Sequence, residues 1–327
     1  MNTSDLLDLP RLGDDLGRLE GQLRSAVASE DPFLTEVARH LVDAGGKRIR
    51  PVLAVGAAAA GRDGVRATDE VLLGGVSVEL VHVGSLCHDD VIDEAVTRRG
   101  VETVNARWGN LMAILAGDFL LARASEIAAG LGTEIARLLA ATIARLCQGQ
   151  TVEIQAAYDI KRSESSYLAA IDGKTASLMS SACRIGALAG GQERHLVDAI
   201  TSFGHAFGMA FQVCDDILDL VGTDASLGKP AGLDMVAGVY TLPVIRALAD
   251  PETGPELAPL LGGPLDEPAR DRAREVVRAS MGIPAAVAVA REWAERAERA
   301  LLPFGGGSVV DQLASLGHRL IDDLPVA

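Results

Sequence analysis

The stretch Val81-His82-Val83-Gly84-Ser85-Leu86-Cys87-His88-Asp89-Asp90-Val91-Ile92-Asp93-Glu94 places an acidic cluster at the end of an apolar run. Asp89 and Asp93 are four residues apart, so on a helix their carboxylates lie on one face, roughly 5–6 Å apart at Cβ. Like charges at this spacing repel, whereas Mg²⁺ takes oxygen ligands and usually shares them with substrate phosphates. For a single motif of this kind, a solvated acidic helix end is the simpler interpretation.

A second acidic cluster makes the cation-binding interpretation stronger. Asp215-Asp216-Ile217-Leu218-Asp219 repeats the same spacing and again follows an apolar helical run. Two acidic clusters that face each other across a cavity would hold several cations. Several cations are what a diphosphate leaving group requires.

The composition predicts an all-α protein. The chain has 327 residues, of which 48% are hydrophobic and 3% aromatic. Helical periodicity recurs along it and strand-like alternation is scarce, so we expect helices around a large core. Length alone allows one domain or two, and we treat residues 1–327 as a single domain. The net charge of −15 argues against nucleic acid as a partner.

Cysteine usage and apolar runs bear on the compartment. The four cysteines lie far apart without a C-x-x-C pair, so we expect buried thiols in a reducing, cytoplasmic environment. Residues 1–10 lack the apolar segment of a signal peptide. The longest apolar run, Pro51 to Gly61, is far shorter than the about 20 residues that cross a membrane, so no transmembrane segment is expected.

The order of elements follows from periodicity and from turn residues. Residues 1–30 predict an amphipathic lead-in helix, and Asp31-Pro32 predicts the start of the next helix, with a capping aspartate and a first-turn proline. The prolines at 251, 255, 259, 264 and 268 predict a surface linker over 250–268. Further helices are expected over 52–60, 69–92, 105–129, 132–160, 172–190, 193–221, 267–302 and 308–323.

A basic turn, Gly45-Gly46-Lys47-Arg48-Ile49-Arg50-Pro51, stands out in this acidic chain. It could be an ordinary exposed turn. As an anion site, its glycines would let the backbone approach a phosphate that Lys47 and Arg50 contact.

Five blocks in register resemble the trans-isoprenyl diphosphate synthases, also called polyprenyl synthetases. The blocks are Gly45 to Pro51, Glu79 to Gly100, Gly173-Lys174-Thr175, Phe211-Gln212 with Asp215 to Asp219, and Gly228-Lys229-Pro230. The resemblance implies a single large helical bundle around a central cavity, Mg²⁺ dependence and usually a homodimer. It also implies head-to-tail condensation of isopentenyl diphosphate with an allylic diphosphate to give an all-trans product.

The resemblance also implies a role for each matching residue. The metal ligands would be Asp89, Asp93, Asp215 and Asp219, with Asp90 and Asp216 as weaker members. The allylic diphosphate would contact Arg98, Lys174, Thr175, Gln212 and Lys229. Isopentenyl diphosphate would contact Lys47, Arg50, His82 and Arg99. His82 precedes Asp89 by about two helical turns and so shares its face, whereas we expect His88 to be structural.

The chemistry fits these residues. When diphosphate leaves an allylic carbon, negative charge grows on oxygen and positive charge on carbon. Preorganised Mg²⁺, Arg98, Lys174 and Lys229 would stabilise the negative charge. Oxygens near Thr175 and Gln212 would stabilise the positive charge. The departing diphosphate can take the released proton, so no nucleophilic side chain is needed.

Two departures concern affinity and product length. Val239 stands where the family commonly has lysine, which puts one cationic contact in doubt. Gly84 and Ser85 stand where short-chain members carry an aromatic residue that closes the product tunnel. We therefore expect a product of geranylgeranyl size or longer, and we expect Gly84→Tyr to shorten it. Such a hydrophobic product suggests transient contact with a membrane surface, although no strongly basic amphipathic anchor is evident.

Three other kinds of protein share some of these features. A class I terpene cyclase would use an acidic Mg²⁺ motif but would leave Lys47, Arg50, His82 and Arg99 unexplained. A di-iron carboxylate bundle needs two Glu-x-x-His pairs, and the sequence has only Glu79 with His82. A non-catalytic subunit of a hetero-oligomeric prenyl synthase would have no need of two intact acidic motifs.

Overall fold

The computed structural model describes residues 7–9, 11–62, 66–223 and 230–325. Within these ranges the regular structure is helical apart from two-residue strands, β1 (Thr97–Arg98) and β2 (Val101–Glu102), which pair antiparallel. The all-α prediction is thereby confirmed. The chain divides into two compact units: residues 1–143, 178–204 and 300–314 form the first, and residues 144–177, 205–299 and 315–327 form the second.

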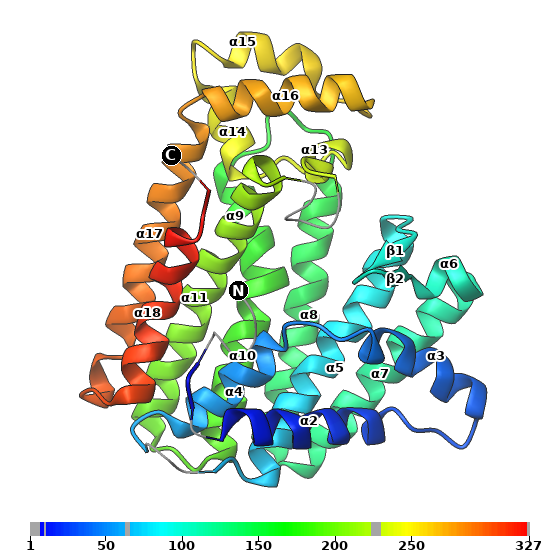
Figure 1. Cartoon of the computed structure of the whole chain (residues 1–327), viewed down its shortest axis with the longest axis vertical. Helices are drawn as coiled ribbons and strands as arrows, with labels where there is room; N and C mark the ends of the chain where they lie inside the picture. The colour runs from blue at the N-terminus through cyan, green and yellow to red at the C-terminus, as the bar shows by residue number, and fades with distance from the viewer. Residues whose placement is uncertain (1–6, 10, 63–65, 224–229, 326–327) are drawn as a thin grey trace. The chain divides into compact units, whose positions relative to one another are not determined.

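The first unit contains the N-terminal helices labelled in Figure 1. They are α2 (Leu12–Ala26), α3 (Pro32–Asp43), α4 (Ile49–Ala59), α5 (Asp69–Ile92), α6 (Val104–Trp108) and α7 (Asn110–Gly130). Asp31 caps α3 by accepting hydrogen bonds from the amides of Phe33 and Leu34, as its sequence predicts. Thr68 caps α5 in the same way through the amide of Val71.

Helix α5 is the core helix of this unit. Its side chains are buried almost continuously from Val71 to Val83, so the helix has no broad polar face. By length and composition α5 could cross a membrane, but 72% of its apolar window is buried inside the protein, as in the core helix of a soluble domain. Helix α7 lies beside it (Figure 1).

The second unit contains α9 (Glu164–Ile171), the π-helix η1 (Asp172–Ala176), and the elements from α13 to α16. The latter are α13 (Leu233–Val236), α14 (Leu242–Ala249), α15 (Gly254–Leu257), the 3₁₀ turn η2 (Ala258–Leu260) and α16 (Glu267–Ala279). The proline-rich segment, expected to be a surface linker, therefore includes two short helical turns. Its Leu257 is fully buried in the core of this unit.

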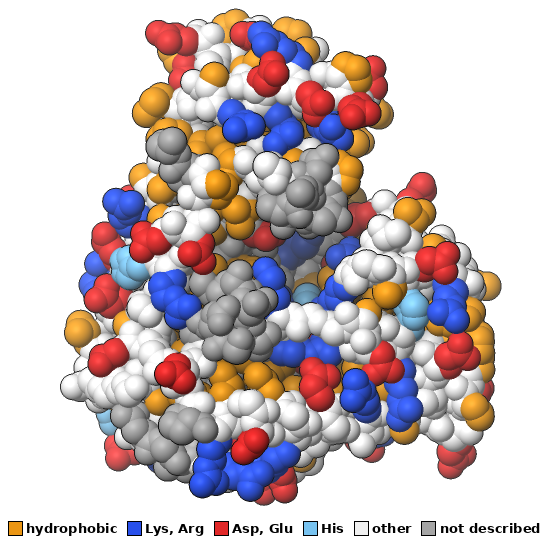
Figure 2. Space-filling model, in the orientation of Figure 1, with side chains coloured by type: hydrophobic (Ala, Val, Ile, Leu, Met, Phe, Trp, Pro, Cys, Tyr) orange, Lys and Arg blue, Asp and Glu red, His pale blue; other side chains and the backbone are white. Residues whose placement is uncertain are grey.

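The remaining helices have residues in both units. They are α8 (Thr133–Gln155), α10 (Ser177–Ala189), α11 (Arg194–Val221), α17 (Gly282–Ala300) and α18 (Ser308–Asp322), and the 3₁₀ turn η3 (Leu302–Phe304) belongs to the first unit. Acidic and basic side chains are interspersed among apolar ones on the face drawn in Figure 2. The net negative charge is thus spread over a surface that carries both signs.

Candidate functional site

The first acidic motif lies at the C-terminal end of α5. Asp89 is half-buried, Asp93 is the exposed residue that follows the last helical residue, and the Asp93 amide donates to the Asp89 carbonyl at 2.8 Å. Carboxylates at a helix C-terminus face the negative end of the helix dipole, and no basic residue lies in the last turn of α5. The oxygen donors of these carboxylates suit a hard divalent metal ion.

Asp90, the middle residue of the motif, turns inward instead. Its side chain is fully buried, and Oδ1 accepts a hydrogen bond from Nε of Arg98 at 2.5 Å. Burial raises the pKa of Asp90, and the positive charge of Arg98 partly offsets that rise. Asn105 donates to the Asp90 carbonyl at 3.1 Å. Asp90 thus holds Arg98, the predicted allylic-diphosphate contact, beside the first motif.

The second acidic motif ends α11. Asp215 is exposed, whereas Asp216 and Asp219 are buried. Asp219 is tied to the following segment, because its carbonyl accepts from the Gly232 amide at 2.8 Å and its Oδ2 accepts from the Asp234 amide at 3.3 Å. No basic residue lies in the last turn of α11, as in α5.

Asp216 is the centre of a buried chain of hydrogen bonds. The Tyr167 hydroxyl donates to Oδ2 at 2.5 Å, and Nε2 of Gln212 donates to Oδ1 at 2.8 Å. The Thr175 hydroxyl in turn donates to Oε1 of Gln212 at 2.7 Å. Burial, with the negative charge of Asp234, raises the pKa of Asp216 well above its ordinary value. Both carboxylate oxygens of Asp216 therefore accept hydrogen bonds from protein side chains.

Lys174 and Thr175 lie in the π-helix η1, a rare local structure that is frequent at functional sites. Gly173 permits a close approach to α8: a Cβ atom there would lie 2.7 Å from the Arg145 carbonyl oxygen and 2.8 Å from Cα of Gly149. Lys174 forms an ion pair with Glu153 of α8, and both side chains are mostly buried. The predicted Lys174, Thr175 and Gln212 are thereby brought together with the second motif. Lys229 lies outside the described residues.

The basic turn lies beside the β1–β2 hairpin. Nη1 of Arg99 donates to the Leu41 carbonyl at 3.2 Å and also to the Gly45 carbonyl. A Cβ atom at Gly46 would lie 2.8 Å from Cζ of Arg99, so a side chain there would displace this guanidinium. Burial lowers the pKa of Arg50 to about 10 and also lowers that of Arg99.

His82 shares this basic environment. Burial, followed by the positive charges of Arg50 and Arg99, lowers the pKa of His82 well below its ordinary value. The imidazole is therefore neutral near pH 7 and can donate one hydrogen bond to an anion. The structure thus groups Arg50, His82 and Arg99, which are three of the four residues predicted to contact isopentenyl diphosphate, while Lys47 is exposed on the same turn.

The two predicted chain-length positions lie on α5. A Cβ atom at Gly84 would lie 3.1 Å from the Gly117 carbonyl oxygen and 3.3 Å from Cβ of Leu120. A side chain at position 84 would therefore meet α7 first. The Ser85 hydroxyl donates to the His82 carbonyl at 2.9 Å.

Several residues near these groups have no role predicted from the sequence. Glu79 is a single acid within an apolar helix, a pattern that marks a buried partner, and Arg48 is the middle cation of the basic turn. Both are buried and form an ion pair. The sequence gives no comparable signal for Tyr167 or Glu153, because only the fold brings these residues into contact with Asp216 and Lys174. Among the described residues, no group of three or more His, Cys, Asp or Glu side chains is arranged to hold a metal ion.

Comparison with known proteins identifies the family. The polyprenyl synthetase family model matches residues 31–279, so the chain belongs to this family. The chain is 46% identical over 240 residues to heptaprenyl diphosphate synthase component 2 of Geobacillus stearothermophilus, covering 73% of this chain and 74% of that protein. It is 40% identical over 294 residues to nonaprenyl diphosphate synthase of Mycobacterium tuberculosis, covering 88% and 87%.

Solved structures agree with this assignment. The heptaprenyl diphosphate synthase of Staphylococcus aureus is 28% identical and superposes with a TM-score of 0.87 over 95% of this chain and 98% of that one. The polyprenyl synthase of Caulobacter crescentus, in complex with calcium and isoprenyl diphosphate, is 31% identical with a TM-score of 0.88 over 94% of each chain. The predicted isoprenoid synthase fold is confirmed.

Proposed function

We propose that the chain is a polyprenyl diphosphate synthase that joins isopentenyl diphosphate to an allylic diphosphate. In each round the allylic C–O bond breaks, diphosphate leaves, and the double bond of isopentenyl diphosphate forms a new C–C bond with the allylic cation. Loss of a proton to the diphosphate restores a double bond. The observation that carries the proposal is that each acidic motif ends a helix beside its own set of predicted diphosphate-binding residues, in a chain of this family.

Mg²⁺ is the metal ion that the donor set suits best. Asp89 and Asp93 of the first motif and Asp215 and Asp219 of the second would supply carboxylate oxygens, the ligands that Mg²⁺ takes together with substrate phosphates. The bound metal would neutralise charge on the departing diphosphate. Asp90 and Asp216 would instead position Arg98 and Gln212.

The cationic side chains bind and orient the two diphosphates. Arg98, held by Asp90, and Lys174, held by Glu153, would contact the allylic diphosphate. Arg50, Arg99 and Lys47 would bind the diphosphate of isopentenyl diphosphate, with neutral His82 as a further donor. Arginine suits this task because its planar fork of donors matches phosphate oxygens.

A long product and an assembly of two copies are further parts of the proposal. Relatives are named heptaprenyl, nonaprenyl and solanesyl diphosphate synthases, and another is named geranylgeranyl diphosphate synthase, which supports a product of geranylgeranyl length or longer. Helix α7 exposes Leu111, Ile114 and Leu115, an apolar face that suits a second copy of the chain. Cys147 is exposed, contrary to the expectation that all four thiols are buried, whereas the buried thiols of Cys87, Cys183 and Cys214 fit a reducing, cytoplasmic location.

One experiment tests the function. The purified chain is incubated with Mg²⁺, isopentenyl diphosphate and an allylic primer, and products are separated by chain length. We expect linear all-trans products of geranylgeranyl length or longer, and loss of product when the metal is chelated. A cyclic hydrocarbon would favour a terpene cyclase.

The assay also addresses a hetero-oligomeric enzyme. The Geobacillus relative is named a component, so absence of diphosphate release from the chain alone would favour a subunit that needs a partner. Mass measurement in solution tests the homodimer, and Leu111→Asp should shift the chain toward the monomer.

A further inference from the structure

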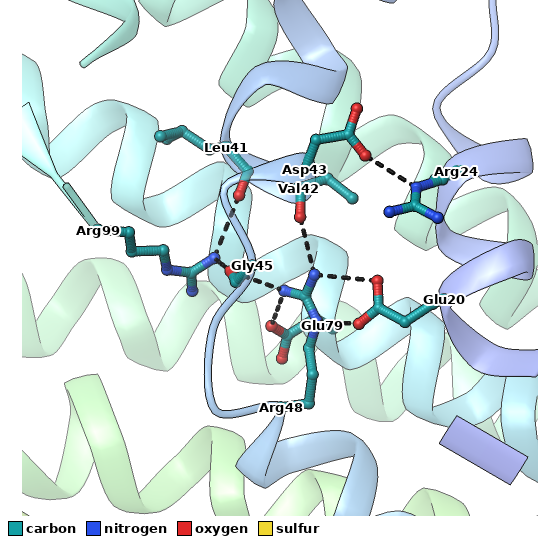
Figure 3. A network of polar contacts seen from close by, with 9 residues as sticks. All are labelled: Glu20, Arg24, Leu41, Val42, Asp43, Gly45, Arg48, Glu79 and Arg99. Atoms are coloured by element: carbon teal, nitrogen blue, oxygen red, sulfur yellow. Dashed lines mark hydrogen bonds and ion pairs between the residues drawn. The ribbon is translucent and has the colours of Figure 1, made fainter. Parts of the chain in front are cut away.

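A buried ion pair lies behind the basic turn and contacts none of the residues assigned to metal binding. The side chains of Arg48 and Glu79 are 5% and 2% exposed, and Nη1 of Arg48 donates to Oε1 of Glu79 at 3.0 Å. Arg48 also donates to both carboxylate oxygens of Glu20 and to the carbonyls of Val42 and Gly45 (Figure 3). The guanidinium is therefore fully used within the protein and is not a substrate contact.

Arg48 and Arg99 fix the same short segment of backbone. Both donate to the Gly45 carbonyl, one from the turn and one from the hairpin (Figure 3). Both have left-handed backbone conformations, with φ of +43° and +54°, which residues other than glycine rarely adopt. Such strain persists only where surrounding contacts enforce it, and here the contacts bring cations together.

Glu79 is the acid that faces these cations. Its charge is the strongest favourable electrostatic influence on both Arg50 and Arg99, opposing the burial that lowers the pKa of each. Its Oε2 atom is buried and has no hydrogen-bond partner among the described residues, and the same holds for Nε of Arg50. One oxygen of Glu79 thus holds Arg48, while the charge of the carboxylate acts on the arginines of the pocket.

We propose that Glu79 is an internal counter-ion of the isopentenyl-diphosphate pocket. Its carboxylate stabilises the clustered arginines of the empty pocket and lowers the affinity of the pocket for diphosphate. The inference rests on the proposed function and deepens it. A bound diphosphate would neutralise the same arginines that Glu79 neutralises. Because the two negative charges share one set of cations, they repel each other, and the carboxylate lowers the affinity for the ligand.

Weaker binding of diphosphate in this pocket favours the repeated addition of isopentenyl units to one chain. In each round the elongated product keeps the diphosphate that arrived with isopentenyl diphosphate, since the allylic diphosphate is the one that leaves. That diphosphate must leave the pocket before another isopentenyl diphosphate can bind. A pocket without the Glu79 charge would bind its substrate more tightly and release the elongated chain more slowly.

The test compares Glu79→Gln with Glu20→Gln. Glutamine keeps an oxygen that can accept from Arg48, so each variant removes one charge with little change in shape. Glu20 contacts the same guanidinium but is 32% exposed, and its charge influences Arg99 less than that of Glu79 does. The dissociation constant of isopentenyl diphosphate is measured by calorimetry without divalent cations, and steady-state kinetics with Mg²⁺ give KM for each substrate.

We expect Glu79→Gln to lower both the dissociation constant and KM of isopentenyl diphosphate about tenfold, the size of one screened charge interaction. The KM of the allylic primer should stay within about twofold, and products should become shorter. Glu20→Gln, which removes the smaller influence on Arg99, should change the dissociation constant by less than about twofold. Glu79→Asp shortens the side chain by one methylene and so moves the charge away from the arginines. It should lower the dissociation constant about threefold, and it replaces Glu79→Gln in the test if the glutamine variant does not fold.

The counter-ion role would be overturned if Glu79→Gln bound isopentenyl diphosphate more weakly than the wild type. It would also be overturned if both glutamine variants changed the dissociation constant equally, because the charge of Glu79 would then have no special effect on the pocket. If the wild-type chain binds isopentenyl diphosphate but forms no product, the proposed synthase activity fails while the shift in binding still decides the role of Glu79. If it does not bind isopentenyl diphosphate, both proposals fail.

Discussion

The two acidic motifs have the same spacing but different surroundings. At the end of α5 the middle aspartate, Asp90, is neutralised by a cation, Arg98. At the end of α11 the middle aspartate, Asp216, is held by two neutral donors, Tyr167 and Gln212. A repeated sequence pattern therefore does not imply a repeated electrostatic environment. The first motif belongs to a cation-rich region, whereas the second belongs to a network of neutral hydrogen bonds with one paired lysine.

The largest expected effect tests what the motifs share. Asp89→Ala and Asp215→Ala should each lower kcat/KM about 1,000-fold or more, because each removes a proposed metal ligand worth several kcal/mol in the transition state. Product formation under saturating Mg²⁺ measures this, with Asp311→Asn on the surface of α18 as the control. Full activity in one of the two alanine variants would show that only the other motif binds metal.

The next effect tests the neutral network of the second motif. Tyr167→Phe removes a donor from the buried carboxylate of Asp216 and should lower the free energy of unfolding by about 2 kcal/mol. We expect kcat to fall about tenfold, because Asp216, which accepts from Gln212 and orients it, loses one of the two donors that fix its own position. Urea unfolding and steady-state kinetics measure the two effects. Tyr158→Phe, whose hydroxyl donates to the Val236 carbonyl at 3.2 Å, is the control for loss of a tyrosine hydroxyl in the same unit.

The all-α fold could be predicted from the sequence better than the contacts between side chains. Asp31 before Pro32 gave the start of α3 because a cap is a local interaction. The grouping of Arg50, His82 and Arg99 agrees with the resemblance that the sequence showed. The contacts of Asp216 with Tyr167 and of Arg48 with Glu79 could not be predicted, because they join residues that are 49 and 31 positions apart. The direction of Gly84 toward α7 likewise depends on packing between helices.

A smaller effect tests the cation-rich region around the first motif. The pKa of His82 lies well below its ordinary value of 6.5 in the folded chain. Below pH 6.5 the unfolded chain thus binds a proton that the folded chain does not, so stability is lost as the pH falls. The slope approaches about 1.4 kcal/mol per pH unit.

Urea unfolding of His82→Gln at several pH values between 5 and 7 measures this effect. The variant should lose less stability on acidification than the wild type. Identical pH profiles for His82→Gln and the wild type would show that His82 is solvated and able to take up a proton in the folded chain.

The smallest effect concerns the packing of the helix that ends in the first motif. Gly84→Ala places a Cβ atom 3.1 Å from the Gly117 carbonyl oxygen, so α5 and α7 must separate by a few tenths of an ångström, and we expect a loss of about 1 kcal/mol in unfolding free energy. Gly17→Ala in α2 meets no atom within 4 Å and should gain a similar amount from helix propensity. A tyrosine at position 84 must displace α7 before its ring can reach a product tunnel. Gly84→Ala disturbs the same contact with α7 but adds no ring, so it is the control for Gly84→Tyr. Shorter products from Gly84→Tyr support the tunnel route only if Gly84→Ala leaves product length unchanged.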